Sequence, residues 1–499
     1  MKNTSRKNTA AIVLTLIWIT AFICCACGKS DDDSPSSSVI QDSRPKADSI
    51  SNTDAGASGS SPQKGAPVTQ SAGETGTDAL GLRFLCADDG ENGCSDSNGY
   101  YYLNYDDIKL SDGSYGSHLM YMDYASCREI FLCSTPGCNH DSPDCTAVLP
   151  SREFPPFSTK LFLFQDHLYA LCCQADAVVS LSAQSASGED SSFMSGNDTI
   201  DHRAGVLYRM NPDGTGREKV YEFASGLTIE GTLAIDHNGL YVITKKLSSE
   251  KTETGSYTSA SEESLMYLNL SSFEAQTLCS LDFGDNISWK VTGCAGGAIL
   301  LRGTDYGRKL TTEEYNDNGQ FKVYFQNSHE VFALLDPSTG SLREFYRISN
   351  ARLLSTAVMN DTLYISIEGG DDIIGVNPTT GEQWTVASLP QTYIWDTLED
   401  VLCCSSWNAG QDYTFYFVNV KTGEAFHSGL VNKSLGWRLE FKAETGRDVL
   451  VIYDYEAAPS ALNDGGYEIT REIYGLISRE DLFAGKDNYR EIQMSGKGY

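Results

Sequence analysis

The chain has 499 residues, of which 40% are hydrophobic and 11% aromatic, and its formal net charge is −30 at pH 7. This excess of carboxylates excludes nucleic acid as an expected partner, because the phosphate backbone would be repelled. The folded part, about 420 residues, is long for one domain unless its units close on themselves.

The N-terminus carries the features of a secretory signal. Basic residues precede an apolar run from Ala10 to Ile23, which is shorter than the ~20 residues a membrane-spanning helix needs. The run ends in ICCACG, where Ala26 precedes Cys27, and this ending resembles a bacterial lipobox. The resemblance implies that residues 1–26 are removed and that Cys27 is lipidated. An ordinary cleaved signal peptide is the alternative.

Residues 27–79 are rich in Ser, Gly, Asp, Thr and Pro and contain almost no large apolar side chains. Such a segment cannot bury enough surface to offset its ordering entropy, so we expect a disordered tether. Its mean reach of roughly 40 Å would hold a folded domain, residues 80–499, away from a membrane. We therefore predict a lipid-anchored protein on the extracellular face of a Gram-positive cell membrane.

One pattern recurs from residue 80 onward. A short apolar strand leads through a turn to a strand of the Leu-Tyr type, and an Asp/Asn-x-x-Thr-Gly turn then leads to a polar-alternating strand, as in Asn360 to Leu389. Gly at such turns is typical of hairpins because it accepts positive φ. Seven of these units start near Tyr101, Leu168, Leu240, Ile299, Leu363, Leu402 and Leu450.

Four strands in each unit, at a spacing of about 40 to 75 residues, predict an all-β fold, a β-propeller. We expect seven four-stranded blades, with six or eight as the alternative counts. An array of β-sandwiches is the other architecture with this pattern, but it would leave the units without mutual closure.

The Leu-Tyr strands with their Thr-Gly turns resemble the low-density-lipoprotein-receptor-type propellers of many uncharacterised bacterial surface lipoproteins. The segment IFLCSTPGCNHDSPDCTA, residues 130–147, is similar to a recurring Cys-x4-Cys-x-His-x4-Cys stretch of those lipoproteins. The resemblance covers nearly all of the ordered chain. It implies a surface location and a propeller fold, and it implies no reaction.

The Cys/His loop at 133–145 contains the candidate metal ligands Cys133, Cys138, His140 and Cys145. Three thiolates and an imidazole form a complete tetrahedral set for one structural zinc ion, or iron. A disulfide or a set of reduced thiols would also account for the cysteines. All three interpretations make the loop structural. With four protein ligands, a bound metal would have no open coordination position for catalysis.

The remaining cysteines suggest other roles. Cys86 and Cys94 flank a turn-rich loop and could form a disulfide in an exported protein. The adjacent pairs Cys172–Cys173 and Cys403–Cys404 lie in predicted strands, so their side chains should point to opposite faces of a sheet. One thiol of each pair is expected to be a buried apolar filler.

The long insertions of the propeller gather on one face. With the strands of each blade lettered A to D from the axis outward, the B–C and D–A connections share a face, which we call the B–C face. The insertions there are Gln174–Ala204, Ser248–Glu263, Gly303–His329 and Glu456–Gly466, and the D–A connection with Cys133–Cys145 is expected beside them. Elaborated loops on a rigid scaffold commonly carry binding sites. The alternative is that these long Ser/Asp-rich insertions are simply tolerated there and carry no site.

We therefore predict a monomeric binding or scaffold module for an extracellular protein or glycan, attached to the membrane through its N-terminal lipid. The alternative is an extracellular hydrolase or lyase with a site at the propeller axis. The chain has no Gly-x-Ser-x-Gly, His-Glu-x-x-His or P-loop motif, so no catalytic residue is assigned.

Overall fold

A computed structural model of the chain describes residues 81–495, apart from 87–92, 156–157, 174–176, 180–198, 202–203, 252–256, 282–286, 309–313, 315–317, 350–353, 368, 407–413 and 460–466. The predicted signal peptide, the lipid site at Cys27 and the tether lie outside the described residues. In the described part of the chain, no helix combines the length and the apolar character that crossing a membrane requires.

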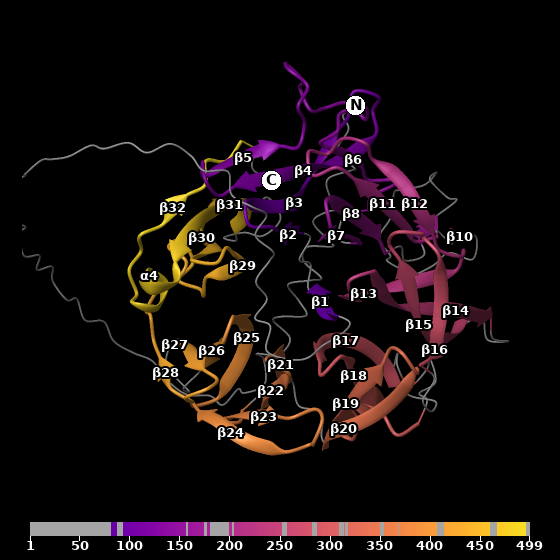
Figure 1. The fold of residues 1–499 in the computed structure, drawn as a ribbon, viewed down its shortest axis with the longest axis vertical. Coiled ribbons are helices and arrows are strands. Elements are labelled where there is room, and N and C mark those ends of the chain that lie inside the picture. Colours follow the sequence, from indigo (N-terminus) through magenta and orange to yellow (C-terminus); the bar gives the residue numbers. More distant parts are fainter. Residues whose placement is uncertain are drawn as a thin grey trace, which may run out of the picture. The chain divides into compact units, whose positions relative to one another are not determined.

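Seven antiparallel sheets form a ring, and each is built on four strands that follow one another outward from the axis (Figure 1). The A to D strands of blade 1 are β2 (Gly93–Ser95), β3 (Gly99–Lys109), β4 (Tyr115–Asp123) and β5 (Arg128–Phe131). Those of blade 2 are β7 (Thr159–Phe164), β8 (His167–Cys172), β11 (Val206–Met210) and β12 (Glu218–Glu222). Those of blade 3 are β13 (Leu227–Ile235), β14 (Gly239–Lys251), β15 (Tyr257–Asn269) and β16 (Ala275–Ser280).

The remaining blades repeat this order. Blade 4 contains β17 (Ile287–Ala295), β18 (Ala298–Asp305), β19 (His329–Asp336) and β20 (Ser341–Ser349). Blade 5 contains β21 (Leu354–Met359), β22 (Thr362–Ile367), β23 (Asp372–Val376) and β24 (Gln383–Ser388). Blade 6 contains β25 (Thr392–Leu398), β26 (Val401–Ser406), β27 (Thr414–Asn419) and β28 (Ala425–Phe426). Blade 7 contains β29 (Glu440–Glu444), β30 (Asp448–Pro459), β31 (Tyr467–Ser478) and β32 (Arg490–Glu491).

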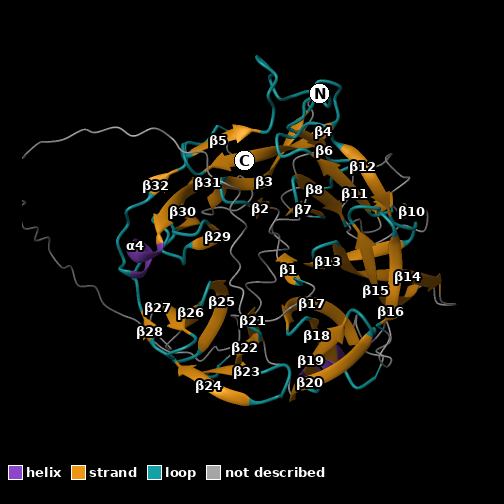
Figure 2. Cartoon of the chain, viewed as in Figure 1, coloured by secondary structure: helices purple, strands orange, loops and turns teal. Residues whose placement is uncertain are grey.

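In the described part of the chain, six further elements lie outside this repeat. They are β1 (Arg83–Cys86), β6 (Val148–Pro150), β9 (Ala177–Val179), β10 (Thr199–Asp201), α3 (Asn318–Gln326) and α4 (Arg479–Phe483). Figure 2 shows that the ring consists mainly of strands and the loops between them. The predicted all-β propeller with seven four-stranded blades is confirmed, and each Leu-Tyr unit begins in the B strand of its blade.

The Leu-Tyr pattern follows from the position of a B strand between two neighbouring blades. Leu240 packs into the cluster shared with blade 2, whereas Tyr241 packs into the cluster shared with blade 4. Leu168 and Tyr169 divide in the same way between blades 1 and 3. Because successive residues of a strand point to opposite faces, a strand that is buried on both faces needs two large apolar residues in succession.

The Asp/Asn-x-x-Thr-Gly pattern is the turn between the C and D strands. In blade 5 the Asn377 side chain accepts the N–H groups of Thr379 and Thr380 at 2.9 and 3.0 Å. The N–H of Gly381 donates to the Asn377 carbonyl at 2.8 Å, and Gly381 has φ +75°. An Asx turn followed by a left-handed residue therefore selects Asn or Asp first and Gly last.

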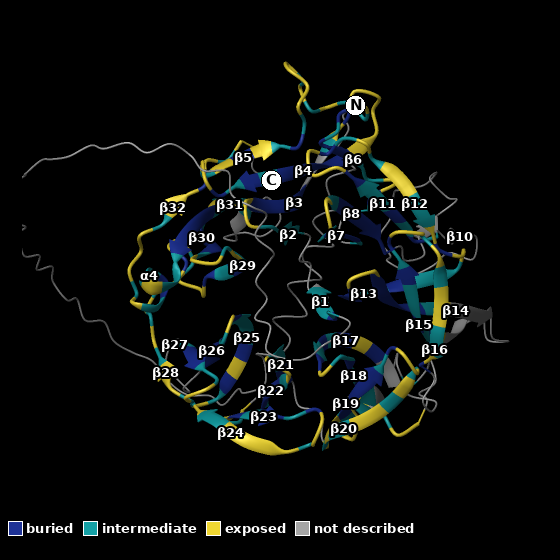
Figure 3. Cartoon of the chain, viewed as in Figure 1, coloured by how far each residue is buried: buried dark blue, intermediate teal, exposed yellow. Residues whose placement is uncertain are grey.

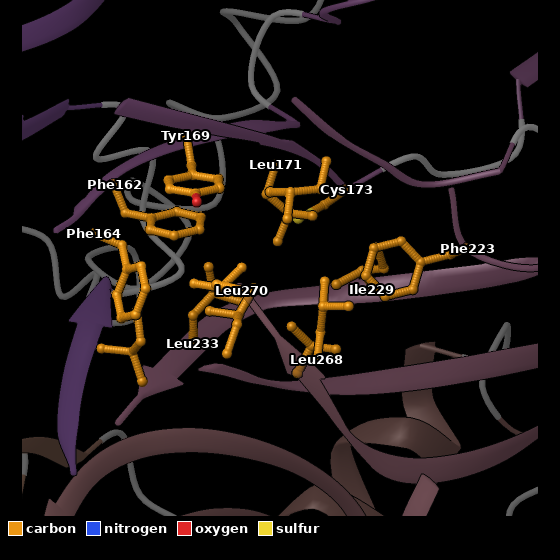
Figure 4. Packing of buried hydrophobic residues seen from close by; sticks show 14 residues of the cluster. Phe162, Phe164, Tyr169, Leu171, Cys173, Phe223, Ile229, Leu233, Leu268 and Leu270 are labelled. Atoms are coloured by element: carbon orange, nitrogen blue, oxygen red, sulfur yellow. The ribbon is translucent and has the colours of Figure 1, made fainter. Parts of the chain in front are cut away.

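Large apolar side chains fill the joints between blades. Phe162, Tyr169 and Leu171 of blade 2 meet Leu233 and Leu268 of blade 3 in one such cluster (Figure 4). Each fully buried side chain of this size contributes about 1.5–3 kcal/mol to stability. Burial falls toward the circumference, where β12, β20 and β24 present many exposed residues (Figure 3).

Strand β1 lies on the inner edge of blade 3. It pairs antiparallel with β13, and Arg83 stands opposite Ile235 at the end of β13 that leads into the A–B turn. Gly81 is close to that turn, since a Cβ on Gly81 would lie 2.2 Å from the His237 ring. The chain therefore enters the propeller from the face of the A–B and C–D turns, which we call the A–B face and which is opposite the B–C face.

The outer strand of blade 1 is split, which corrects the expected position of the Cys/His loop. Strand β5 pairs with Met120–Asp123 of β4, and β6 continues the same antiparallel pairing along Gly116–His118. The loop is therefore an excursion from the middle of the D strand, and not part of a free D–A connection. It folds back over the B–C turn of blade 1, where the Ser111 N–H donates to the Asp141 carbonyl at 2.7 Å.

Candidate metal centre

The two halves of the split outer strand bring the ends of the Cys/His loop together. The Leu132 N–H donates to the Leu119 carbonyl at 3.0 Å, and the Leu119 N–H donates to the Ala147 carbonyl at 2.8 Å. Both ends are thus hydrogen-bonded to the same residue of β4. Gly137, with φ +71°, provides the reversal within the loop. Strand β4 therefore holds both ends of the Cys/His loop, although the loop itself turns sharply.

The four predicted ligands converge. One donor atom from each of Cys133, Cys138, His140 and Cys145 lies within 4.8 Å of all the others. The His140 Nδ1 atom is 3.4 Å from the Cys145 Sγ atom. The three cysteines carry no disulfide, so the predicted convergence is found and a disulfide within this group is not.

Each sulfur of the cluster also accepts a backbone N–H from the residue two positions later. This arrangement favours thiolate, since a hydrogen bond to the charged form stabilises it. The donor and acceptor pairs are Thr135 to Cys133, His140 to Cys138 at 3.4 Å, and Ala147 to Cys145. The same short-range contact thus recurs at all three sulfurs, and at Cys133 and Cys145 it acts to lower the pKa of the thiol.

The thiols differ in how readily they ionise. Burial opposes ionisation of Cys133, but hydrogen bonds from the backbone and side chain of Thr135, from Cys145 and from Thr146 outweigh it and lower the Cys133 pKa to about 7. Burial raises the pKa of Cys145 to about 12, and the neighbouring thiols of Cys138 and Cys133 add to this rise. A bound cation would stabilise the thiolate form of Cys145, because metal binding displaces the thiol proton.

His140 is held in place by aromatic and hydrogen-bonding neighbours. Its ring stacks on the Phe131 ring with centroids 4.3 Å apart and planes inclined by 16°. The His118 Nε2 atom lies 2.8 Å from the His140 carbonyl oxygen, which supports a backbone with φ +56°. Burial and the nearby His118 lower the His140 pKa, although Asp141 opposes them. The imidazole is therefore neutral near pH 7, which is the form that binds metals.

A small apolar cluster borders the ligands. Leu110, Cys145, Ala147 and Val148 are buried together, and Phe131 packs against them. Four donors of the Cys3His type, bordered by these buried side chains, could hold a metal ion. Among the described residues, this is the one group in which at least three His, Cys, Asp or Glu ligand atoms converge. Four protein ligands suit a structural centre.

The other cysteine predictions have mixed outcomes. Cys172 and Cys173 enter different clusters, as do Cys403 and Cys404, so the predicted alternation is confirmed. All four are buried, which extends the filler role to both members of each pair. The side chain of Cys86 lies outside the described residues, so its pairing with Cys94 stays a prediction.

Sequence reasoning missed the residues that support the ligands. Thr135 lies two positions after Cys133 and hydrogen-bonds its sulfur. This short spacing is visible in the sequence and could have indicated Thr135 as a supporting residue. His118 and Phe131 reach the loop through the pairing of β4 with β5 and β6. That pairing depends on the split of the outer strand, which no local pattern indicates.

Comparison with known proteins yields distant structural matches. The chain is similar to an oligogalacturonate lyase in complex with manganese, with 13% identity, 81% of this chain and 98% of that chain covered, and a TM-score of 0.38. It is also similar to TolB from Acinetobacter baumannii, with 11% identity, 78% of this chain and 79% of that chain covered, and a TM-score of 0.30. A third match is a puromycin-hydrolyzing peptidase from Mycobacterium tuberculosis, with 9% identity, 84% of this chain and 57% of that chain covered, and a TM-score of 0.44.

No family model and no curated protein matches the chain. The structural matches are too distant to transfer a reaction, a substrate or a metal. The fold and the Cys3His cluster therefore stand on the geometry of this chain.

Proposed function

We propose that the protein is a membrane-anchored extracellular lipoprotein whose propeller binds a protein or glycan through its B–C face. One observation carries the proposal: the strand ends that carry the long insertions share this face with the exposed side chains of Tyr393 and Trp437, and β1 enters the propeller from the opposite face. A tether attached on the A–B face would leave the B–C face directed toward the surroundings. Cys27 is the proposed lipid site.

Exposed aromatic residues add to the case for this face. Tyr393 lies at the start of β25 and Trp437 lies just before β29, so both belong to the B–C side of the ring, and both are exposed. The guanidinium of Arg438 lies over the Trp395 ring, 5.0 Å from its centroid. Rigid aromatic side chains supply contact area at a low cost in conformational entropy, which suits recognition of a partner.

We propose one zinc ion, or iron, as the structural cofactor of the Cys3His centre. The donor set suits Zn²⁺, which takes three thiolates and one imidazole in a tetrahedral arrangement. When bound, the ion would neutralise the sulfurs and connect the two ends of a loop that lacks regular structure between β5 and β6. Cys133, Cys138, His140 and Cys145 would hold it.

The rival hypothesis, an extracellular hydrolase or lyase at the axis, requires acid and base side chains that converge at the channel mouth. It stays a prediction. Turnover of a polysaccharide or peptide by the purified protein, abolished by a substitution on an inner strand, would favour it over the binding proposal.

Replacing Cys27 with Ala should release the protein from membranes into the medium. The physical reason is that the acyl chains on Cys27 would provide the hydrophobic attachment, and a chain with a net charge of −30 has no electrostatic attraction to anionic lipid. The measurement is fractionation followed by salt and carbonate washes. A Cys27→Ala protein that remains with washed membranes would contradict the lipid anchor.

Replacing Trp437 with Ala should weaken binding of the full chain to its ligand by roughly tenfold or more, as expected for an aromatic anchor. The probes are a printed glycan array, purified peptidoglycan and a panel of extracellular proteins, with affinity measured for whichever binds. Trp384→Ala is the matched control, because Trp384 is exposed to 40% against 46% for Trp437 but lies on the outer strand β24. Equal losses in the two variants would contradict the assignment of the binding face.

A further inference from the structure

The ring is closed by its C-terminal segment, which runs beside the outer strand of blade 1. Arg128 and Gln493 form a parallel bridge. The Glu129 N–H donates to the Gln493 carbonyl at 3.0 Å, and the Gln493 N–H donates to the Cys127 carbonyl at 2.9 Å. Strand β5 thus has β4 on one edge and the C-terminal segment on the other.

A buried carboxylate reinforces this closure. Glu129 accepts hydrogen bonds from the Tyr102 hydroxyl and, at 2.6 Å, from the Ser495 N–H. Beside it, Ile492 is buried in the cluster between blades 1 and 7, and Met494 packs against that cluster. Strand β5 therefore contributes to the seam between the first and last blades, beside the apolar packing of their inner strands.

Phe131, the last residue of β5, connects the seam to the metal centre. On one side its ring stacks on His140 and meets His118 edge-on, with centroids 4.8 Å apart. It also packs against the cluster that contains Ile492. One side chain thus contacts a proposed metal ligand and the apolar seam, and it belongs to the strand that binds the C-terminal segment.

We propose that metal occupancy of the Cys3His centre controls how tightly the propeller ring is closed. The inference rests on the proposed metal centre and goes beyond it. With metal bound, His140 is fixed and holds Phe131, so β5 keeps its place between β4 and the C-terminal segment. Without metal, His140 loses its anchor, the four-residue β5 frays from the end at Phe131, and the C-terminal segment opens more often.

Hydrogen exchange measured by mass spectrometry on the full chain tests the coupling. Protein loaded with one equivalent of zinc is compared with protein stripped by a chelator under reducing conditions. Removing zinc should accelerate exchange in residues 128–131 and 490–495 by roughly tenfold, because local opening governs exchange at such edges. Exchange in β20, an outer strand of blade 4, should stay unchanged.

The variant Phe131→Leu separates the connection from the ligands. It keeps an apolar side chain but removes the ring that stacks on His140. It should retain zinc, and removing zinc from it should no longer change exchange in residues 490–495. If this variant fails to fold, the comparison of loaded and stripped wild-type protein still decides the question.

Two outcomes would overturn the inference in distinguishable ways. Zinc that binds with full occupancy but leaves exchange at the C-terminal segment unchanged would reject the coupling and leave the metal centre intact. Protein that takes up neither zinc nor iron would reject the metal centre itself, and with it the coupling.

Discussion

Replacing His140 with Ala is expected to abolish tight zinc binding and the stability that depends on it. The ligand set falls to three sulfurs, and the ring that stacks on Phe131 disappears. At free zinc a thousandfold above Kd, wild-type protein should gain about 4 kcal/mol in free energy of unfolding by linkage. The variant should gain far less, as measured by denaturant unfolding at graded zinc concentrations.

His427→Ala is the matched control for this experiment. His427 is exposed and lies outside the converging group, so its loss should change neither zinc content nor the zinc dependence of unfolding. A His140→Ala protein with the zinc response of the wild type would contradict the proposed role of His140. That result would favour a centre built from the three cysteines alone.

Replacing Ile492 with Ala should destabilise the closed ring by about 2–5 kcal/mol, the range for truncating a large aliphatic side chain in a core. Ile492 is only 1% exposed and lies in the cluster between blades 1 and 7. A cavity there would weaken the contact between the first and last blades. The free energy of unfolding from denaturant titration is the measurement.

Ile130→Ala provides the matched control at the same seam. Ile130 lies in β5, yet its side chain is 47% exposed, so the same truncation should cost less than about 0.5 kcal/mol. Equal destabilisation by the two variants would contradict the claim that the buried Ile492 holds the ring together. It would indicate that any truncation near β5 disturbs closure.

The fold was predictable because its repeat has a physical cause at every blade. Leu240 and Tyr241 are consecutive because one faces each neighbouring blade, and Asn377 with Gly381 forms a turn whose geometry few other residues accept. Such requirements are local, so they remain visible in the sequence. Their sevenfold recurrence then identifies the closed ring.

The candidate site was predictable only in its ligands. Cys133, Cys138, His140 and Cys145 are close in sequence, so their convergence needs only a tight loop. The neighbours that position them, above all His118, are brought there by pairing between strands, as is the C-terminal segment that closes the ring. The split of the outer strand into β5 and β6 is a tertiary feature without a local signature.

The most direct test of the metal centre is X-ray absorption spectroscopy at the zinc and iron edges, on full-length protein purified without chelator. We predict about one equivalent of metal per chain. For zinc, the first shell should contain three sulfur atoms at about 2.3 Å and one nitrogen atom at about 2.0–2.1 Å. A metal-free protein in which any two of Cys133, Cys138 and Cys145 form a disulfide would contradict the account.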